Sequence, residues 1–257
     1  MNQNKGDYGK RITCLLYDEG MIKTWARDKP EGWTLVSGIW SPFYINLRPL
    51  ASKRNSKEIL SEIGSAMGTV VKRDIPYISR LVGLYIAGIP LASAITLMAG
   101  IPSCFGRNLP DIKTKQEFYE RLPDLRKKLE EHGEHGLVEG DFCDGDQIAI
   151  IDDLATKFNT KLVAKAQIQE AAKDKKVSVS CTDVVVLIDR EQGAKEIAET
   201  NGMKLWSLIP FKTKGVQWLK DRMRPLEYEI ITDYLKDEKK YQDQKLQNEL
   251  RDAASTK

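Results

Sequence analysis

Between residues 81 and 209, short apolar runs alternate with segments of helical periodicity, and this alternation constrains the fold more than any other feature of the sequence. The apolar runs cover residues 81–87, 101–105, 147–151, 184–188 and 205–209, and the helical patterns cover residues 91–98, 161–172 and 192–200. Strands that are apolar along their whole length are typical of parallel sheets buried on both faces. We therefore predict an α/β fold with a twisted parallel sheet flanked by helices.

The flanking segments follow other patterns. Residues 8–25 and 56–72 have helical spacing, and residues 32–47 are predicted to form extended segments with a turn at Ser37 and Gly38. Residues 108–139 are long, charged and interrupted by Pro110 and Pro123, so we expect a mobile or partly helical excursion outside the core. Residues 225–257 are predicted to form a terminal helix whose charged last part is solvated.

Composition excludes several classes of protein. The 40 basic and 37 acidic residues leave a net charge of +3, too small to indicate a nucleic-acid or anionic-membrane partner. No apolar run approaches the roughly 20 residues of a membrane helix, and the polar start of the chain lacks the apolar core of a secretion signal. The four cysteines are scattered, which indicates reduced thiols in a cytoplasmic protein rather than a disulfide framework or a zinc site.

The apolar strand at residues 148–153 ends in two aspartates, Asp152 and Asp153. Ligands of open α/β sheets bind beyond the carboxyl ends of the strands, so the two carboxylates lie at the expected ligand edge. The next helix is predicted to begin near Asn159 and Thr160, and the free N–H groups of a helix start attract phosphate. This arrangement suits a sugar phosphate, with carboxylates for ribose hydroxyls and amides for the phosphate. The alternative is that the two aspartates only cap the turn that follows.

Residues 148–156 (Ile-Ala-Ile-Ile-Asp-Asp-Leu-Ala-Thr) resemble the phosphoribosyl-diphosphate motif of type I phosphoribosyltransferases. Three further stretches resemble the orotate branch of that family, in the same order along the chain. They are residues 37–48 (Ser-Gly-Ile-Trp-Ser-Pro-Phe-Tyr-Ile-Asn-Leu-Arg), 88–92 (Gly-Ile-Pro-Leu-Ala) and 189–193 (Asp-Arg-Glu-Gln-Gly). Together the matches span about residues 32–209. Fold and activity are separate conclusions, however, because one fold supports many functions.

The resemblance implies a domain organisation and an activity. Residues 1–225 would form the phosphoribosyltransferase-like domain, in which residues 1–50 make a small N-terminal hood and residues 108–139 a loop excursion. Residues 226–257 would be an extra C-terminal helix. The implied reaction joins orotate, a pyrimidine base, to the ribose of phosphoribosyl diphosphate and releases pyrophosphate. Mg²⁺ would be bound with the diphosphate substrate, and a homodimer is implied.

The resemblance also implies roles for particular residues. Asp152 and Asp153 would hold the ribose. The base would be held by Tyr44, Ile45, Thr156 and Arg190, the phosphate by Lys157, Asn159 and Thr160, and the pyrophosphate by Lys127, Lys128 and His132. Arg190 has an alternative as a turn residue that pairs with Glu191 or stays in solvent. His132 and His135, the two histidines of the chain, also fit a solvent-facing pair or, with neighbouring glutamates, a metal site.

Four positions depart from the family pattern. Val36 and Ala87 stand where lysines are usual, Glu130 stands where a catalytic lysine is common, and Phe158 replaces a glycine of the phosphate loop. A phenylalanine there is expected to obstruct the approach of a phosphate to the backbone. Arg107 competes with the basic residues near Lys127 as the match to a family arginine. These departures leave three hypotheses open: an active orotate phosphoribosyltransferase, a non-catalytic homologue that binds a pyrimidine or nucleotide, and a transferase with a changed substrate.

Overall fold

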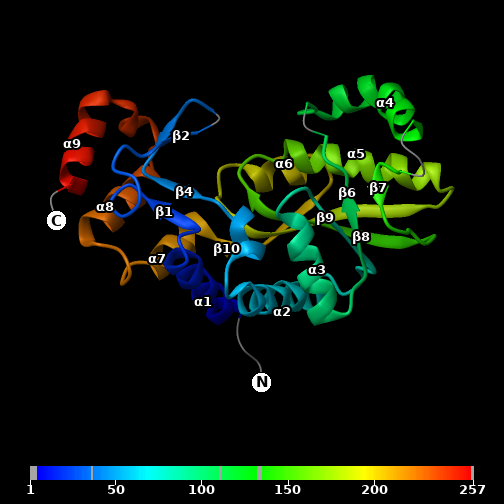
Figure 1. Cartoon of the computed structure of the whole chain (residues 1–257), viewed down its shortest axis with the longest axis horizontal. Helices are drawn as coiled ribbons and strands as arrows, with labels where there is room; N and C mark the ends of the chain where they lie inside the picture. Colours follow the sequence, from blue (N-terminus) through cyan, green and yellow to red (C-terminus); the bar gives the residue numbers. More distant parts are fainter. Residues whose placement is uncertain (1–4, 36, 110, 132–134, 256–257) are drawn as a thin grey trace. The chain divides into compact units, whose positions relative to one another are not determined.

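The computed structural model describes residues 5–35, 37–109, 111–131 and 135–255 (Figure 1). The chain divides into two compact units, one made of residues 50–208 and the other of residues 1–49 together with 209–257. A short 3-10 helix (Arg48–Ser52) spans the join between them. The domain boundary expected after residue 225 stays a prediction.

The unit of residues 50–208 contains a six-stranded sheet with the order β10-β9-β8-β5-β6-β7. Its strands are β5 (Arg80–Gly83), β6 (Ser103–Gly106), β7 (Val138–Glu139), β8 (Asp146–Ala155), β9 (Val179–Asp189) and β10 (Lys204–Pro210). Strands β6, β5, β8 and β9 pair in parallel, and β7 pairs antiparallel with β6. Each of the five apolar runs overlaps a strand, so the prediction of an α/β fold with a parallel sheet is confirmed.

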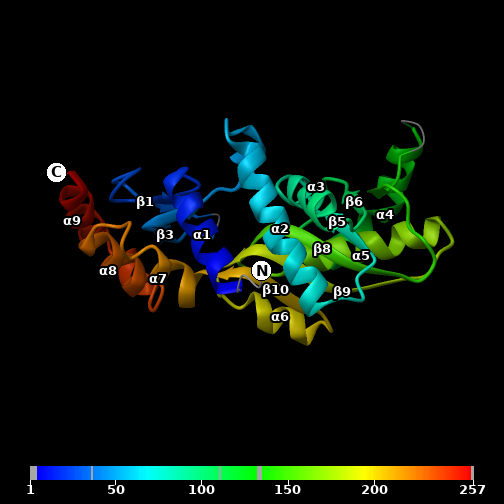
Figure 2. The same ribbon diagram turned by 90° about the horizontal axis from the view of Figure 1, so that it is seen from below.

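Helices cover both faces of this sheet. They are α2 (Ser56–Asp74), α3 (Gly88–Ala99), α5 (Asn159–Asp174) and α6 (Ala194–Thr200), and α4 (Lys115–Glu130) packs on the outer side of α5. Figure 1 shows α5 and α6 on one side of the sheet and α2 and α3 on the other, and in Figure 2, seen from below, α2 crosses in front of the strands. Ile148 and Ile150 of β8 belong to the core on the α5 side, together with Val163 and Ala166. Because helices cover both faces of the sheet, a ligand site is expected at the ends of the strands.

Helix α4 lies within residues 108–139, which were expected to form a mobile or partly helical excursion outside the core. Its first turn is closed by a capping box, in which the Thr114 hydroxyl accepts from the Glu117 N–H and the Glu117 carboxylate accepts from the Thr114 N–H. Phe118 and Leu122 are 0% and 7% exposed and belong to the hydrophobic core. The helical alternative is therefore the one found, and placing these two side chains outside the core was wrong.

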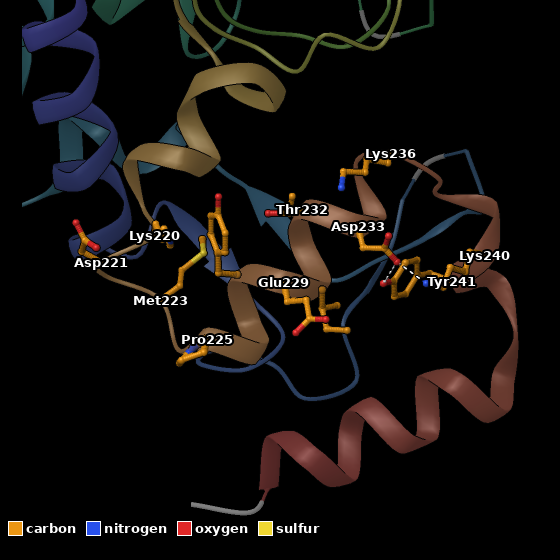
Figure 3. Close-up of a pocket in the computed structure, with 12 residues that line it drawn as sticks. Lys220, Asp221, Met223, Pro225, Glu229, Thr232, Asp233, Lys236, Lys240 and Tyr241 are labelled. Atoms are coloured by element: carbon orange, nitrogen blue, oxygen red, sulfur yellow. Dashed lines mark hydrogen bonds and ion pairs between the residues drawn. The ribbon is translucent and has the colours of Figure 1, made fainter.

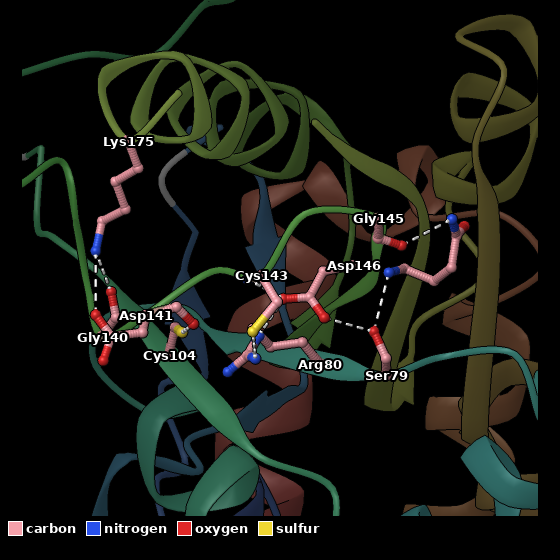
Figure 4. A network of polar contacts seen from close by, with 10 residues as sticks. Ser79, Arg80, Cys104, Gly140, Asp141, Cys143, Gly145, Asp146 and Lys175 are labelled. Atoms are coloured by element: carbon pink, nitrogen blue, oxygen red, sulfur yellow. Dashed lines mark hydrogen bonds and ion pairs between the residues drawn. The ribbon is translucent and has the colours of Figure 1, made fainter. Parts of the chain in front are cut away.

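The amino end of β8 is fixed by a polar network (Figure 4). The Arg80 guanidinium pairs with the Asp146 carboxylate at 2.5 Å. The same carboxylate accepts hydrogen bonds from the Ser79 hydroxyl at 2.8 Å and from the Cys143 N–H at 2.7 Å. These contacts join the start of β8 to the start of β5 and so stabilise the register between the two strands. The network lies at the amino ends of the strands, and the two aspartates lie at the other end of β8.

The other unit is built from both ends of the chain. From the N-terminal side it has α1 (Lys5–Asp18), β1 (Ile22–Thr24), β2 (Trp33–Thr34), β3 (Trp40–Ser41) and β4 (Phe43–Ile45). From the C-terminal side it has a π-helical turn (Phe211–Gly215), α7 (Val216–Trp218), α8 (Pro225–Tyr234), a 3-10 helix (Lys239–Gln242) and α9 (Gln244–Ser255). The sequence pattern predicted one terminal helix, and the structure has two, α8 and α9.

An aromatic core joins the two ends of the chain in this unit. The ring of Phe43 lies 5.2 Å from that of Phe211 and 5.9 Å from that of Tyr234, measured between centroids. The ring of Tyr241 lies 5.7 Å from Tyr234 and stacks on Trp40 at 6.5 Å. Aromatic pairs at these separations stabilise a core beyond the area they bury. Among the described residues, no helix has the length and apolar character needed to cross a membrane.

Candidate active site at the carboxyl edge of the parallel sheet

Three turns meet at the carboxyl ends of β5, β8 and β9. The Leu84 N–H donates to the Ile151 carbonyl at 2.9 Å, and the Arg190 N–H donates to the Ala155 carbonyl at 2.9 Å. At the start of α3, a Cβ on Gly88 would lie 2.3 Å from the Ile151 carbonyl oxygen, so this approach requires glycine. The turn after β5 and the end of β9 therefore flank the last residues of β8 on its two sides.

The acidic pair lies at this edge, inside β8. The Asp152 Oδ2 atom is 2.7 Å from the Lys161 ammonium, and the Asp152 Oδ1 atom accepts the Asp153 N–H at 2.9 Å. The Lys161 ammonium also donates to the Leu154 carbonyl at 2.8 Å. Lys161 is only 4% exposed, so its charge is held by these partners rather than by water. The pair is thus part of a network and more than a cap for the turn.

The two carboxyl groups of the pair differ in their environment. Burial and, secondly, the charge of Asp152 raise the pKa of Asp153 from 3.8 to about 7, although Lys161 acts in the opposite direction. Adjacent carboxylates rarely both stay ionised in a desolvated site. Asp153 therefore changes its charge near neutral pH, a property found more often at functional sites than elsewhere.

The loop between β8 and α5 contains the predicted phosphate-binding residues. Thr156 is half-buried, and Lys157, Asn159 and Thr160 are exposed. Asn159 and Thr160 begin α5, and Phe158, the residue before them, makes no side-chain cap to the helix. The first turn of α5 therefore presents its backbone N–H groups and the positive end of its dipole where an anion is expected.

Phe158 does not obstruct this loop. Its φ is −107°, an ordinary value for any residue, so no glycine is needed at this position. Its side chain is 0% exposed and packs in the core on the α5 side of the sheet. The expectation that Phe158 blocks phosphate was wrong, because the side chain points into the protein rather than into the loop.

Arg190 follows directly on the last residue of β9, and β9 runs parallel to β8 with Asp189 paired to Ala155. The Arg190 residue is 7% exposed, which excludes the alternative of an arginine left in solvent. The turn after it is held by the Asp189 carboxylate, which accepts the Glu191 N–H at 2.8 Å. The structure thus brings Arg190 to the same edge as Asp152.

Two predicted base-binding residues belong to the other compact unit. Tyr44 and Ile45 both lie on β4, where Ile45 is buried and Tyr44 is 38% exposed. The Tyr44 ring stacks on Trp33 with centroids 6.0 Å apart. Tyr44 therefore offers an exposed aromatic face, which is the kind of surface a planar base stacks on.

The structure does not bring Lys127 and Lys128 to the acidic pair. Both are exposed in the last turn of α4. Their neighbour Arg126 pairs with Glu170 at 3.0 Å, in the second half of α5. At 1.5 Å per residue, Glu170 lies about 17 Å along α5 from Asn159, where the phosphate loop ends. In this conformation the two lysines are therefore near the far end of α5.

The other residues singled out in the sequence lie in several different parts of the chain. Val36 and His132 lie outside the described residues. Ala87 is buried at the start of α3, and Glu130 is exposed at the end of α4. His135 is exposed, with its Nδ1 atom 3.7 Å from the Glu139 carboxylate. Among the described residues, no group of three His, Cys, Asp or Glu side chains is arranged to hold a metal ion.

Lys161 is the residue of this site that sequence reasoning missed. It is the third residue of α5, in a first turn where the helix dipole disfavours a cation. That unfavourable position was the available signal, but a lysine near a helix start is ordinarily read as a solvated side chain. Only the fold shows that it reaches back to the end of β8.

A separate cavity of about 680 Å³ lies in the unit formed by the two chain ends (Figure 3). Tyr228, Met223 and Tyr241 line it together with charged residues of both signs. The Asp233 carboxylate accepts the Tyr241 hydroxyl at 2.7 Å at its border. None of the residues predicted for the sugar-phosphate site lines this cavity.

Comparison with known proteins places the chain in a family, although no family model matches it. The orotate phosphoribosyltransferase of Saccharolobus solfataricus is 30% identical over 204 residues, which cover 79% of this chain and 88% of that protein. Among solved structures, Leishmania donovani UMP synthase has a TM-score of 0.68 at 22% identity over 90% of this chain, which spans 43% of that one. The orotate phosphoribosyltransferase of Aeropyrum pernix has a TM-score of 0.56 at 22% identity and covers 82% of this chain and 97% of its own.

The structural likenesses confirm the fold, and the relative at 30% identity matches most of both chains. The sheet, the acidic pair at the end of β8 and the uncapped helix start after it agree with that likeness. This chain belongs to the orotate phosphoribosyltransferase family of type I phosphoribosyltransferases.

Proposed function

We propose that this chain transfers a phosphoribosyl group from phosphoribosyl diphosphate to orotate and releases pyrophosphate. One observation carries the proposal. The acidic pair of β8 and the uncapped start of α5 lie at one sheet edge, six positions apart from Asp153 to Asn159, and Arg190 follows the neighbouring strand at the same edge. A carboxyl pair, an anion-binding helix start and a guanidinium are the groups that a ribose, a 5′-phosphate and an orotate carboxylate require.

In this reaction the bond from the ribose carbon to the diphosphate oxygen breaks, and a bond to a ring nitrogen of the base forms. Positive charge develops on the sugar while negative charge grows on the departing pyrophosphate. The acidic pair, with Asp153 beside the ribose, would favour the cation-like sugar, and the backbone N–H groups of Asn159 and Thr160 would fix the 5′-phosphate. Catalysis would come from positioning and charge stabilisation.

The base and pyrophosphate contacts are part of the same proposal. Arg190 and Thr156 would hold the base from the β8 and β9 ends. The base contacts expected of Tyr44 and Ile45 stay a prediction from the sequence. The closure of Lys127 and Lys128 over the pyrophosphate would require the end of α4 to leave its place beside α5. The pyrophosphate contact expected of His132 stays a prediction from the sequence. The ion pair of Arg126 with Glu170 would have to break in that movement.

The residues present fit Mg²⁺ only as a companion of the substrate. Asp152 is already paired with the Lys161 ammonium, and no protein-made group of metal ligands is found among the described residues. Mg²⁺ is usually held by substrate phosphates with few protein ligands. We propose that it enters with the diphosphate, whose charge it would neutralise.

A homodimer and a cytoplasmic location complete the proposed assignment. Helix α3 exposes the apolar side chains of Leu97 and Met98, which are 84% and 49% exposed, and such a patch is compatible with a subunit interface.

The proposed reaction is tested by mixing the protein with orotate, phosphoribosyl diphosphate and Mg²⁺ and following the absorbance of orotate. We expect a loss of absorbance that depends on phosphoribosyl diphosphate and is matched by released pyrophosphate. Asp153→Asn is the control, because it removes one acid of the pair and should lower the rate by at least about tenfold. Absence of turnover in a folded protein that still binds nucleotide would contradict the enzyme proposal.

The alternative function is a non-catalytic member that binds a pyrimidine or nucleotide. It is favoured by the position of Lys127 and Lys128 near the far end of α5 and by the ion pair that already engages Asp152. In that case calorimetry would show binding of a nucleotide while the absorbance assay stayed flat. The two experiments together separate the two functions.

Arg190→Ala is expected to weaken binding of orotate by about 1.5–3 kcal/mol, the scale of hydrogen bonds to charged groups. The reason is that a guanidinium binds a carboxylate with two parallel hydrogen bonds. Calorimetry on the folded variant measures the loss, and Arg190→Lys should recover only part of it. Arg121→Ala, which changes an exposed arginine of α4, is the matched control and should bind like the unmodified protein.

A further inference from the structure

Lys161 carries a positive charge in a place where a charge is costly. The residue is 4% exposed and lies in the first turn of α5, at the positive end of the helix dipole. Desolvation of an ammonium costs several kcal/mol unless oxygen partners replace the water. The partners of Lys161 therefore decide whether this residue is tolerated.

Two oxygens from β8 supply that compensation. The ammonium lies 2.7 Å from Asp152 Oδ2 and donates to the Leu154 carbonyl at 2.8 Å. The side chain thus reaches back across the loop and ties the helix start to the strand end. Because Asp152 Oδ1 accepts the Asp153 N–H, both carboxylate oxygens of Asp152 have protein partners.

The charge at this edge follows from the same contacts. Two adjacent carboxylates without a cation would present up to two negative charges to a ligand that is itself strongly anionic. Like charges a few ångströms apart in a partly desolvated site repel strongly. One internal ammonium, bonded to one member of the pair, lowers that repulsion and leaves the other member available.

We propose, resting on the proposed function, that Lys161 is a positioning residue that holds Asp152 as the internal member of the acidic pair and leaves Asp153 to receive the ribose hydroxyls. Asp152 then contributes to the site through geometry, and Asp153 contributes through contact with the sugar. Without the Lys161 ammonium, the Asp152 carboxylate would be a second negative charge facing the ligand.

The roles are separated by measuring the affinity for phosphoribosyl diphosphate with Mg²⁺ by calorimetry. Lys161→Met should weaken binding about tenfold, because Asp152 is left as an unpaired charge near the ligand. Adding Asp152→Asn to Lys161→Met should restore affinity to within about threefold of the unmodified protein, since neither charge remains. Asp153→Asn should weaken binding whether or not Lys161 is present. Lys165→Met, one turn further along α5, is the control and should change nothing.

Two results would overturn the proposal. One is unchanged affinity in Lys161→Met. The other is a double variant of Lys161 and Asp152 that binds more weakly than Lys161→Met, which would show that Asp152 contacts the ligand directly. If Lys161→Met does not fold, the double variant, with both charges removed, decides alone: affinity near that of the unmodified protein supports the proposal, and lost affinity overturns it.

A ligand-free measurement distinguishes failure of this inference from failure of the proposed function. The chemical shifts of the carboxyl carbons of Asp152 and Asp153 are followed by NMR as the pH is changed. The charged groups of this edge that can affect them include Lys161 and, at the end of β9, Asp189 and Arg190. Lys161→Met should shift the titration step of Asp153 to higher pH, because Lys161 lowers the pKa of Asp153, and Lys165→Met should leave it unchanged. An unchanged step overturns the inference. A shifted step in a protein that binds no phosphoribosyl diphosphate instead overturns the proposed function.

Discussion

Phe158→Ala is expected to lower the free energy of unfolding by about 3–5 kcal/mol, the usual cost of truncating a fully buried phenylalanine. Phe158 is 0% exposed and packs in the core on the α5 side of the sheet. Its loss would leave a cavity beneath the phosphate loop, which its neighbours fill only in part. Urea unfolding without ligand, with stability taken from the midpoint and slope, measures the effect.

Lys157→Ala is the matched control, because Lys157 is the exposed neighbour of Phe158 in the same loop. Its stability should change by less than about 0.5 kcal/mol. A Phe158 variant as stable as this control would show that the side chain does not lie in the core. Phe158→Gly should bring no gain in phosphate affinity, because the side chain it removes does not stand in the path of a phosphate.

Phe158 also shows where prediction from sequence stops. Motif comparison pointed to the loop between β8 and α5, assigned the phenylalanine to the place of a glycine and concluded that it blocks the site. Whether a side chain points into a loop or beneath it depends on the backbone path, and here φ is negative and the ring turns inward. The residue type alone does not determine the direction in which the side chain points.

The apolar strands and the acidic pair were predictable because each depends on a local pattern. Lys161 was not, because its partners are set by the angle at which α5 leaves β8. The common core of the two chain ends was not predictable either. The contact of Phe43 with Phe211 joins residues far apart in the sequence, and no local periodicity reports such a contact.

Asp153→Asn is expected to stabilise the protein at pH 8 by about 1–3 kcal/mol and at pH 5 by less than half as much. Burial and the neighbouring Asp152 raise the pKa of Asp153 from 3.8 to about 7. Because the folded pKa lies above the unfolded one, the folded state holds the proton more tightly. The contribution of this group to stability is therefore fully present below about pH 4 and is lost as the pH rises through 7. An asparagine at this position stays neutral at every pH, so the variant does not lose this stability as the pH rises.

Urea unfolding at several pH values between 5 and 8 measures this difference. The curve of stability against pH should be flatter for Asp153→Asn than for the unmodified protein, whereas parallel curves would contradict the raised pKa. Asp152→Asn provides the contrast. It removes the partner of Lys161 and should destabilise the fold at both ends of the range, because it leaves a buried ammonium with the Leu154 carbonyl and a neutral amide.

A carboxyl group whose ionised form destabilises the fold at neutral pH makes sense where a ligand supplies the missing hydrogen bonds. Ribose hydroxyls can donate to Asp153 and replace part of the hydration that burial removes. A ligand that binds only the folded state stabilises it by an amount that grows with the logarithm of its affinity. Phosphoribosyl diphosphate with Mg²⁺ should therefore raise the melting temperature of the unmodified protein at pH 8 by more than that of Asp153→Asn. Equal shifts would show that Asp153 does not face the sugar, and its raised pKa would then reflect burial and the neighbouring Asp152 charge alone.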